Sequence, residues 1–189
     1  MSDPNGTSSV GAPTWTDLDA AAAGAAWPTA TLPPGARLRA LAAGLPGVVV
    51  EHRELHAPVE QVWGFIADLP TSVPTFDASV ASLEVLARDG TRLRARARSG
   101  WWFVRMPLVF DVDLEPGWCW MVSRPRLYVV GMAAEAHPDD AGRTVFTHLE
   151  GVPFGGRILG PVLRATRLIQ RRHVSSDLDG IARALGLGP

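Results

Sequence analysis

The chain has 189 residues, 47% of them hydrophobic and 20% charged, with a formal net charge of −1. This length fits one domain with an extension, the composition is that of a folded core, and the near-neutral charge argues against a nucleic-acid binder. The single cysteine, Cys119, excludes both an intramolecular disulfide and a cysteine-rich zinc site.

Residues 1–46 contain six prolines among many small residues and show no sustained hydrophobic period. The N-terminus lacks the basic start and the apolar run of a signal peptide, and no window approaches the roughly 18–20 apolar residues of a membrane span. We therefore expect a cytoplasmic protein with an N-terminal extension, 1–46. The extension is either a mobile tail or a lid packed by Trp15 and Trp27. We expect its deletion to leave the thermal unfolding of domain 47–189 nearly unchanged.

From Val48 onward, glycine and proline residues bound segments with regular hydrophobic patterns. Val48–Leu55 is rich in β-branched residues and predicts a strand. Pro58 then opens a helix at its first turn, and apolar residues at helical spacing continue it until just before Pro70. A short second helical turn or loop follows at 71–76.

Six further strands are predicted, at 80–88, 91–98, 104–114, 118–123, 127–136 and 143–149. Asp89-Gly90 is a strong signal for a two-residue hairpin turn between the first two of them. Strand 91–98 alternates apolar or small residues with arginines, so one face points inward and the other outward. Because the connections are short, the strands form an antiparallel meander.

Residues 156–185 can form one helix about 45 Å long. Arginines fall on one side of its projection, and an apolar stripe falls on the other. The stripe includes Ile169 and Val162, which we expect to be nearly fully buried. Ile169→Ala should then cost about 2–5 kcal/mol. Four polar residues lie within the same stripe and need a partner or a ligand: Thr166, Gln170, His173 and Asp177.

This order of elements resembles the START-like or polyketide-cyclase (SRPBCC) superfamily. The segments HAPVEQVWGFIADLP and AEAHPDDAGRTVFTHLEGVPFGGRILGPVL are similar to its structural motifs, although Leu69 separates Asp68 from Pro70. The resemblance covers about residues 47–186, and residues before Gly47 lie outside the family pattern. It implies an α+β helix-grip fold: a curved antiparallel seven-stranded sheet wrapped around the long C-terminal helix, with a short helix pair after the first strand. The family has no universal catalytic set.

The resemblance also implies a cavity between sheet and helix for an apolar or aromatic molecule. Small inward residues such as Ala95, Ala97 and Ala134 leave volume there. The tryptophans at 101, 102, 118 and 120 would either fill that space or form an aromatic wall. The expected ligand-binding residues are Thr166, Gln170, Ile169, Val162, Met132, Phe146, Phe110, Leu108, Trp120 and Trp63.

Four residues are candidates for proton transfer. Asp177 lies one helical turn after His173 and could orient its imidazole, or the two could form a structural or solvated pair. His148 alternates with Phe146 on a face that points inward, but a lone strand histidine can equally be structural. Tyr128 would offer a hydroxyl inside the cavity or pack with its tip at the rim.

Motifs for other chemistries are missing from the sequence. It contains no glycine-rich phosphate loop, no nucleophile elbow and no cluster of histidine, cysteine and carboxylate at metal-ligand spacing, so we expect no cofactor and no metal. The arginines of strand 91–98 form either a solvated convex face or a docking surface for an acidic carrier protein.

Two functions remain open. The first is binding of a hydrophobic or aromatic small molecule, lipid- or polyketide-like. The second is a cyclase, aromatase or dehydratase-like lyase that positions a bound chain and moves protons with His and Tyr side chains.

Overall fold

The computed structural model describes residues 32–45, 47–99, 107–152 and 160–187, the side chains of 160–166 excepted. Its elements, in chain order, are α2 (Pro34–Gly44), β1 (Val48–Leu55), α3 (Val59–Ala67), α4 (Leu69–Phe76), β2 (Val80–Asp89), β3 (Arg92–Ser99), β4 (Leu108–Glu115), β5 (Trp118–Arg124), β6 (Val129–His137), β7 (Asp140–Gly151) and α5 (Gly160–Ala184).

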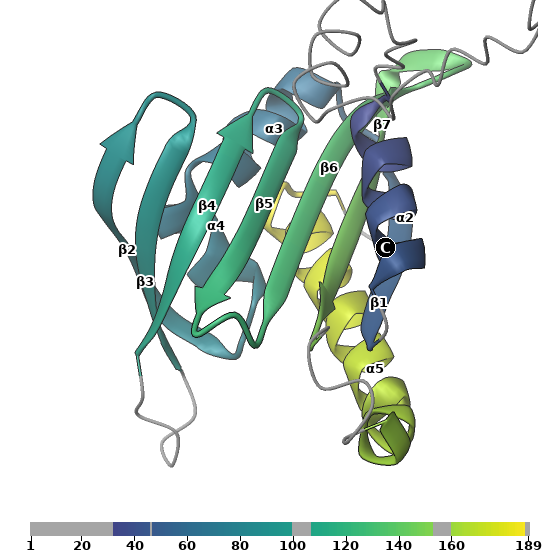
Figure 1. The fold of residues 1–189 in the computed structure, drawn as a ribbon. Coiled ribbons are helices and arrows are strands. Elements are labelled where there is room, and N and C mark those ends of the chain that lie inside the picture. The colour runs from purple at the N-terminus through teal and green to yellow at the C-terminus, as the bar shows by residue number, and fades with distance from the viewer. Residues whose placement is uncertain (1–31, 46, 100–106, 153–159, 188–189) are drawn as a thin grey trace, which may run out of the picture. The chain divides into compact units, whose positions relative to one another are not determined.

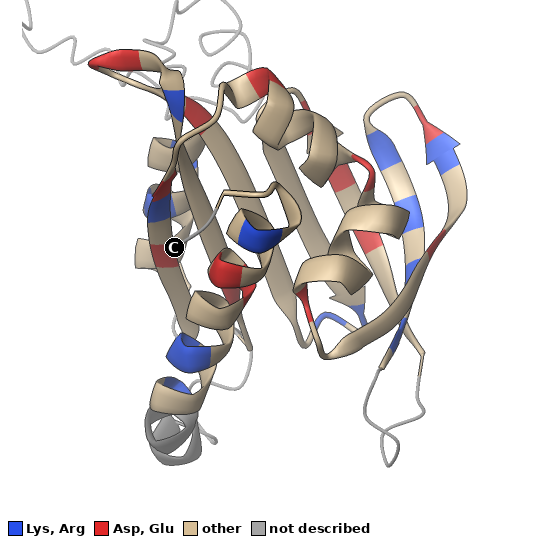
Figure 2. Cartoon of the chain, turned by 180° about the vertical axis from the view of Figure 1, so that it is seen from behind, with Lys and Arg blue, Asp and Glu red and all other residues tan. Residues whose placement is uncertain are grey.

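The seven strands form one antiparallel sheet in the order β1-β7-β6-β5-β4-β3-β2. Helices α3, α4 and α5 lie on one face of this sheet, and α2 lies on the other (Figures 1 and 2). We call these the inner and the outer face. The predicted α+β helix-grip architecture, with a helix pair after the first strand, is confirmed. Predicted strand positions 104–106 lie outside the described residues.

The inner face carries the main core. Strand β3 alternates as predicted: Leu93, Ala95 and Ala97 are buried, and the arginines between them point away from the core. Phe146 of β7 and Val62 of α3 are fully buried on the same side. This core anchors the helix pair and α5 to the concave surface, which positions the functional site described below.

Helix α5 packs through its C-terminal half. Val174, Leu178 and Ile181 are buried, and they repeat at three to four residues along one side of the helix. The predicted burial of Ile169 is wrong, because its side chain is 68% exposed. At 100° per residue, Ile169 lies about 140° around the helix from Val174 and so faces away from the sheet. The side chains of Val162 and Thr166 fall outside the described residues.

Two glycines allow close approach of helices to their neighbours. A Cβ at Gly180 of α5 would lie 2.6 Å from the carbonyl oxygen of Phe76, so the end of α4 packs directly on the α5 backbone. A Cβ at Gly131 of β6 would overlap the side chain of Leu38 from α2 and come within 3.1 Å of Trp120. Each contact requires the absence of a side chain.

Helix α2 covers part of the outer face. Its Leu38 is fully buried in a second core with Trp118, Val129 and Leu149. The Trp118 and Trp120 rings stack there, with centroids 6.3 Å apart. Trp120 was expected to bind the ligand, but it lies on the outer face, because alternation along β5 turns Cys119 and Met121 inward and the tryptophans outward. Residues 34–44, which sequence analysis assigned to the extension, thus pack on the sheet.

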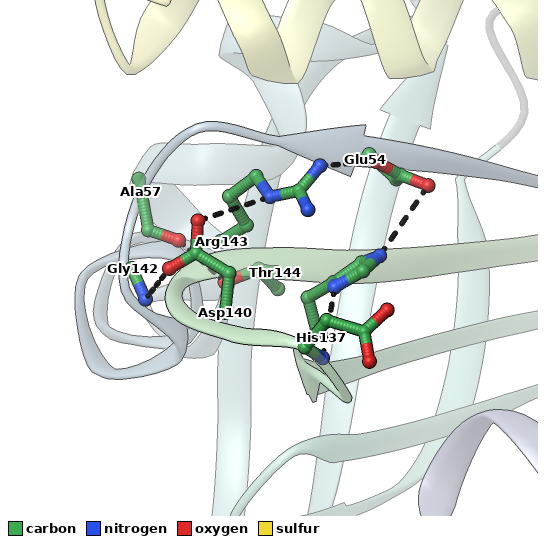
Figure 3. A network of polar contacts seen from close by, with 8 residues as sticks. Glu54, Ala57, His137, Asp140, Gly142, Arg143 and Thr144 are labelled. Carbon is green, nitrogen blue, oxygen red and sulfur yellow. Dashed lines mark hydrogen bonds and ion pairs between the residues drawn. The ribbon is translucent and has the colours of Figure 1, made fainter.

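A polar network ties the β6–β7 turn to β1 (Figure 3). The Arg143 guanidinium donates to Glu54 at 3.0 Å and to Asp140 at 3.2 Å, and the Thr144 hydroxyl donates to the Ala57 carbonyl at 2.7 Å. His137 lies 3.6 Å from Glu54. These contacts fix the strand edge at the opposite end of β7 from His148 and Glu150.

Candidate functional site

A cavity of about 390 Å³ lies between the inner face and α4. Every strand from β2 to β7 contributes to it, and most of the wall is apolar, as shown by Leu83, Phe110, Met121, Val130 and Met132. Exposed side chains of Arg98 and Leu108 border it as well. Small inward residues on β3, such as Ala97, leave the space that larger side chains would fill.

The structure distributes the predicted ligand-binding residues over several places. Leu108, Phe110 and Met132 line the cavity. Phe146 is fully buried in the adjoining core and does not line the cavity, and Trp63 borders a separate, more open groove near α2. On α5, Gln170 is half-buried and Ile169 is exposed.

Polar side chains gather at one end of the cavity. The Tyr128 hydroxyl donates a 2.7 Å hydrogen bond to Oε2 of Glu150, and Oε1 of Glu150 lies 3.2 Å from Nε2 of His148. All three residues line the cavity. Strand β7 sets His148 and Glu150 two residues apart and therefore on the same face. Ser123 holds Tyr128 in place, since its hydroxyl accepts from the Tyr128 backbone N–H at 2.9 Å.

Helices α4 and α5 complete this group. Nε2 of His173 lies 3.4 Å from Oε2 of Glu150, 3.6 Å from Oδ2 of Asp177 and 3.7 Å from Oδ1 of Asp77. Asp177 and Asp77 are buried, and the His173 side chain is 32% exposed. Asp77 follows the last residue of α4 and accepts the Ser79 backbone N–H at 2.8 Å. We name these residues the polar cluster: Asp77, Tyr128, His148, Glu150, His173 and Asp177.

The pKa values in the polar cluster follow from burial and close charges. Burial opposes a charged imidazole, but the carboxylates of Asp177 and Glu150 outweigh it and raise the pKa of His148 to about 10. Burial works against ionisation of Glu150, yet His148 lowers the pKa of its carboxyl below the ordinary value. Burial, followed by the negative charge of Glu150, raises the pKa of Tyr128. Burial also raises the pKa of Asp177.

Two atoms of the polar cluster are buried without a hydrogen-bond partner: Nδ1 of His148 and Oδ2 of Asp177. The His148 ring packs edge-on against Phe76, with centroids 6.3 Å apart. Buried polar atoms without partners are uncommon in folded proteins and mark places where a ligand or ion completes the contacts.

Glu150 and Asp77 were not predicted as site residues from the sequence. Glu150 shares the inward face of β7 with Phe146 and His148, so a carboxylate in phase with an apolar residue was an available signal. Asp77 carried no such signal, because it lies after a short helix and reaches the site only when α4 packs on α5.

In its chemistry, the polar cluster can hold and move protons. Tyr128 is a neutral hydroxyl donor, Glu150 is a carboxylate acceptor, and His148 links Glu150 to Asp177. Tyr128, His148 and Glu150, which line the cavity together with Asp77, could bind a carbonyl or hydroxyl group, or exchange a proton with it.

No family model matches the chain, and no curated protein matches it. Solved structures do. The protein TTHA0849 from Thermus thermophilus is 21% identical with a TM-score of 0.55, over 73% of this chain and 96% of that one. The Zhui aromatase/cyclase from Streptomyces sp. R1128 is 16% identical with a TM-score of 0.54, over 74% and 93%. A START superfamily protein from Mycobacterium smegmatis is 15% identical with a TM-score of 0.55, over 73% and 98%.

These similarities establish the fold: the chain has the START-like/polyketide cyclase helix-grip fold that sequence analysis expected. They leave the ligand and the reaction to be argued from this chain's own residues. Among the described residues, no helix has the length and apolar character needed to cross a membrane.

Proposed function

We propose that the chain binds a hydrophobic or aromatic small molecule, lipid- or polyketide-like, in the cavity between the sheet and the helices. The observation that carries this proposal is a cavity of about 390 Å³ with a largely apolar wall and four residues of the polar cluster at one end. Small-molecule sites commonly measure about 300–1,000 Å³ and combine an apolar lining with a few polar groups. The apolar part of the ligand would pack on Phe110 and Met132, and a polar group would reach Tyr128 and Glu150.

The test fills the cavity from the sheet side. Val130→Trp adds an indole at a β6 residue that lines the cavity, and Val122→Trp is the matched control on the outer face of β5. We expect N-phenyl-1-naphthylamine to bind the wild-type chain and Val122→Trp with increased fluorescence, and to bind Val130→Trp at least tenfold more weakly. Native mass spectrometry of the purified protein should show a co-purifying small molecule that Val130→Trp loses. Equal probe binding by all three proteins would refute the proposal.

A second candidate, an aromatase or cyclase, is supported by the 2.7 Å hydrogen bond between Tyr128 and Glu150, a proton donor and a proton acceptor that both line the cavity. In this reaction, Glu150 accepts a proton from a methylene flanked by two carbonyl groups. The enolate carbon formed bonds to a carbonyl carbon of the same chain, and Tyr128 gives its proton to the resulting alkoxide. Glu150 returns its proton to Tyr128 across their 2.7 Å hydrogen bond, and loss of water then forms the double bond.

The two candidate functions are distinguished by measuring product formation and probe binding in the same variants. A linear poly-β-ketone thioester is incubated with the wild-type chain, Tyr128→Phe, Glu150→Gln and the exposed control Glu115→Gln. The cyclase predicts aromatic absorbance that falls at least 100-fold in the first two variants and persists in the control. A binding protein gives no product with any of them, while probe fluorescence is retained.

An acidic carrier protein is the partner that the arginines of β3 would accept. Arg94 and Arg96 are paired with Asp111 and Glu84, whereas Arg98 borders the cavity itself. Arg98→Ser should weaken the binding of a ligand attached to an acidic carrier and leave the free ligand unaffected. Equal weakening of both would assign Arg98 to the cavity alone.

A further inference from the structure

Four residues from three separate parts of the chain converge at the polar end of the cavity, where Asp77 and Glu150 line the wall: Asp77, Glu150, His173 and Asp177. Each offers one ligand atom, and these atoms lie within 4.8 Å of one another. Asp77 comes from the end of α4, Glu150 from β7, and the other two from successive turns of α5. Carboxylate oxygens and imidazole nitrogens are the usual protein ligands of divalent cations.

The distances from His173 to the three carboxylates are long for charged hydrogen bonds. The three carboxylates lie 3.4, 3.6 and 3.7 Å from Nε2 of His173, whereas a charged hydrogen bond to nitrogen is about 2.7–2.9 Å long. Ligands held at about 2.0–2.2 Å in a tetrahedron lie about 3.3–3.6 Å from each other. The spacings from His173 lie close to this range, and all four ligand atoms lie within 4.8 Å of one another, which suits a single cation between them.

An independent observation concerns Asp177. Its residue is 1% exposed, and its Oδ2 atom forms no hydrogen bond, although Nε2 of His148 lies 3.5 Å away and Nε2 of His173 lies 3.6 Å away. A buried carboxylate oxygen without a donor is costly, and a bound cation would remove that cost.

We propose that the polar cluster binds one divalent transition-metal ion, Zn²⁺ or Mn²⁺, through Asp77, Glu150, His173 and Asp177. The imidazole ligand disfavours Mg²⁺ and Ca²⁺, which prefer all-oxygen sites. This inference goes beyond the proposed binding of an organic molecule in the cavity, because none of the four contacts to the metal ion requires that molecule.

His148 would support the site without binding the ion. Its Nε2 atom lies 3.2 Å from Oε1 of Glu150 and 3.5 Å from Oδ2 of Asp177. A buried imidazole that contacts ligating carboxylates fixes their orientation, as outer groups commonly do at metal sites. Tyr128 does the same for Oε2 of Glu150.

The test uses the full chain after treatment with a chelator and dialysis. Calorimetry with ZnCl₂, MnCl₂ and MgCl₂ gives stoichiometry and affinity, and thermal unfolding is recorded with each ion. The variants are Asp177→Asn and His173→Gln. The matched control is Asp179→Asn, which makes the same change at an exposed position two residues further along α5. A folded far-ultraviolet spectrum is required of each variant, and Asp77→Asn replaces Asp177→Asn if the latter is unfolded.

We expect one Zn²⁺ per chain, weaker binding of Mn²⁺, the weakest binding of Mg²⁺, and a higher Tm with Zn²⁺. Asp177→Asn and His173→Gln should each weaken Zn²⁺ binding at least tenfold, and Asp179→Asn should leave it unchanged. Zn²⁺ binding that survives both variants would place the ion on surface histidines and overturn the proposal. Failure to bind Zn²⁺ or Mn²⁺ would overturn it as well, whereas the cavity proposal would stand or fall on the fluorescent probe.

Discussion

The Tyr128 hydroxyl and the Glu150 carboxylate are joined by a 2.7 Å hydrogen bond at the polar end of an otherwise apolar cavity. The bond links the start of β6 to the end of β7 and gives the cavity a neutral donor beside a carboxylate. Because burial and the charge of Glu150 both disfavour a phenolate, the pKa of Tyr128 is raised well above its usual value near 10.

This relationship predicts the alkaline titration of the protein. Tyr128 is the only tyrosine in the chain, so absorbance at 295 nm reports on one phenol. We expect no phenolate in the folded protein at pH 10–11, and a normal titration near pH 10 in 8 M urea. Since the folded pKa is the higher one, its contribution to stability is complete below pH 10 and is lost as pH rises toward the folded value. A reversible phenolate signal near pH 10 in the folded protein would contradict the buried hydrogen bond.

The two ends of α5 should respond differently to truncation. Ile181 is fully buried, and Ile181→Ala should lower the free energy of unfolding by about 2–5 kcal/mol. Ile169 is 68% exposed, and Ile169→Ala should change it by no more than about 0.5 kcal/mol. Urea denaturation of the two variants measures both values. A large loss for Ile169→Ala would show that this part of α5 packs against something else.

Gly180 provides a test of the packing that brings Asp77 to the polar cluster. Gly180→Ala would place a methyl group 2.6 Å from the carbonyl oxygen of Phe76, so α4 must move away from α5. We expect a loss of about 1–3 kcal/mol in stability and weaker Zn²⁺ binding, since Asp77 directly follows Phe76.

The matched control is Gly64 of α3, where an added Cβ meets nothing within 4 Å. Gly64→Ala should be neutral or stabilise the chain by up to about 1 kcal/mol, through helix propensity alone. Equal effects of the two substitutions in thermal unfolding would show that α4 and α5 are not in close contact.

Local patterns in the sequence were sufficient for the architecture. Alternation along 91–98 and the proline-bounded helix after Val48–Leu55 carry short-range signals, and the structure contains both elements. The predicted hairpin is also present, but its turn lies one residue later than Asp89-Gly90, because Asp89 pairs with Arg92 and the turn residues are Gly90 and Thr91. The outer face was harder to predict. Trp120 was expected in the cavity because a large aromatic residue normally points toward the core, but α2 gives the sheet a second core on its other side.

The arrangement of the site could not be predicted from the sequence, because it depends on packing between helices and strands that leaves no local pattern. His148, Tyr128, His173 and Asp177 were recognised as candidates from their positions on strand or helix faces, and the fold brings them together with Asp77 and Glu150. Their convergence follows from the docking of α5 across β7 and of α4 against Gly180, and neither contact has a signature in residue spacing. A scan for metal-ligand spacing fails for the same reason, since the four ligands span 101 positions, from Asp77 to Asp177.

The last prediction concerns residues 34–44 and follows from the packing of the core on the outer face. Leu38 is fully buried against β6, and a Cβ at Gly131 would overlap its side chain. Leu38→Ala should therefore cost about 2–5 kcal/mol, and Gly131→Ala about 1–3 kcal/mol.

Together the two changes should cost less than the sum of their separate effects by about 1 kcal/mol or more, because truncation of Leu38 makes room for the new methyl group. The same contacts lead us to expect that deletion of residues 1–46, which removes α2, lowers the free energy of unfolding. The matched variant is Leu41→Ala, on the same helix and 38% exposed, which should cost less than about 1 kcal/mol. Strict additivity in the double variant, together with unchanged stability after the deletion, would mean that α2 does not rest on Gly131 in solution.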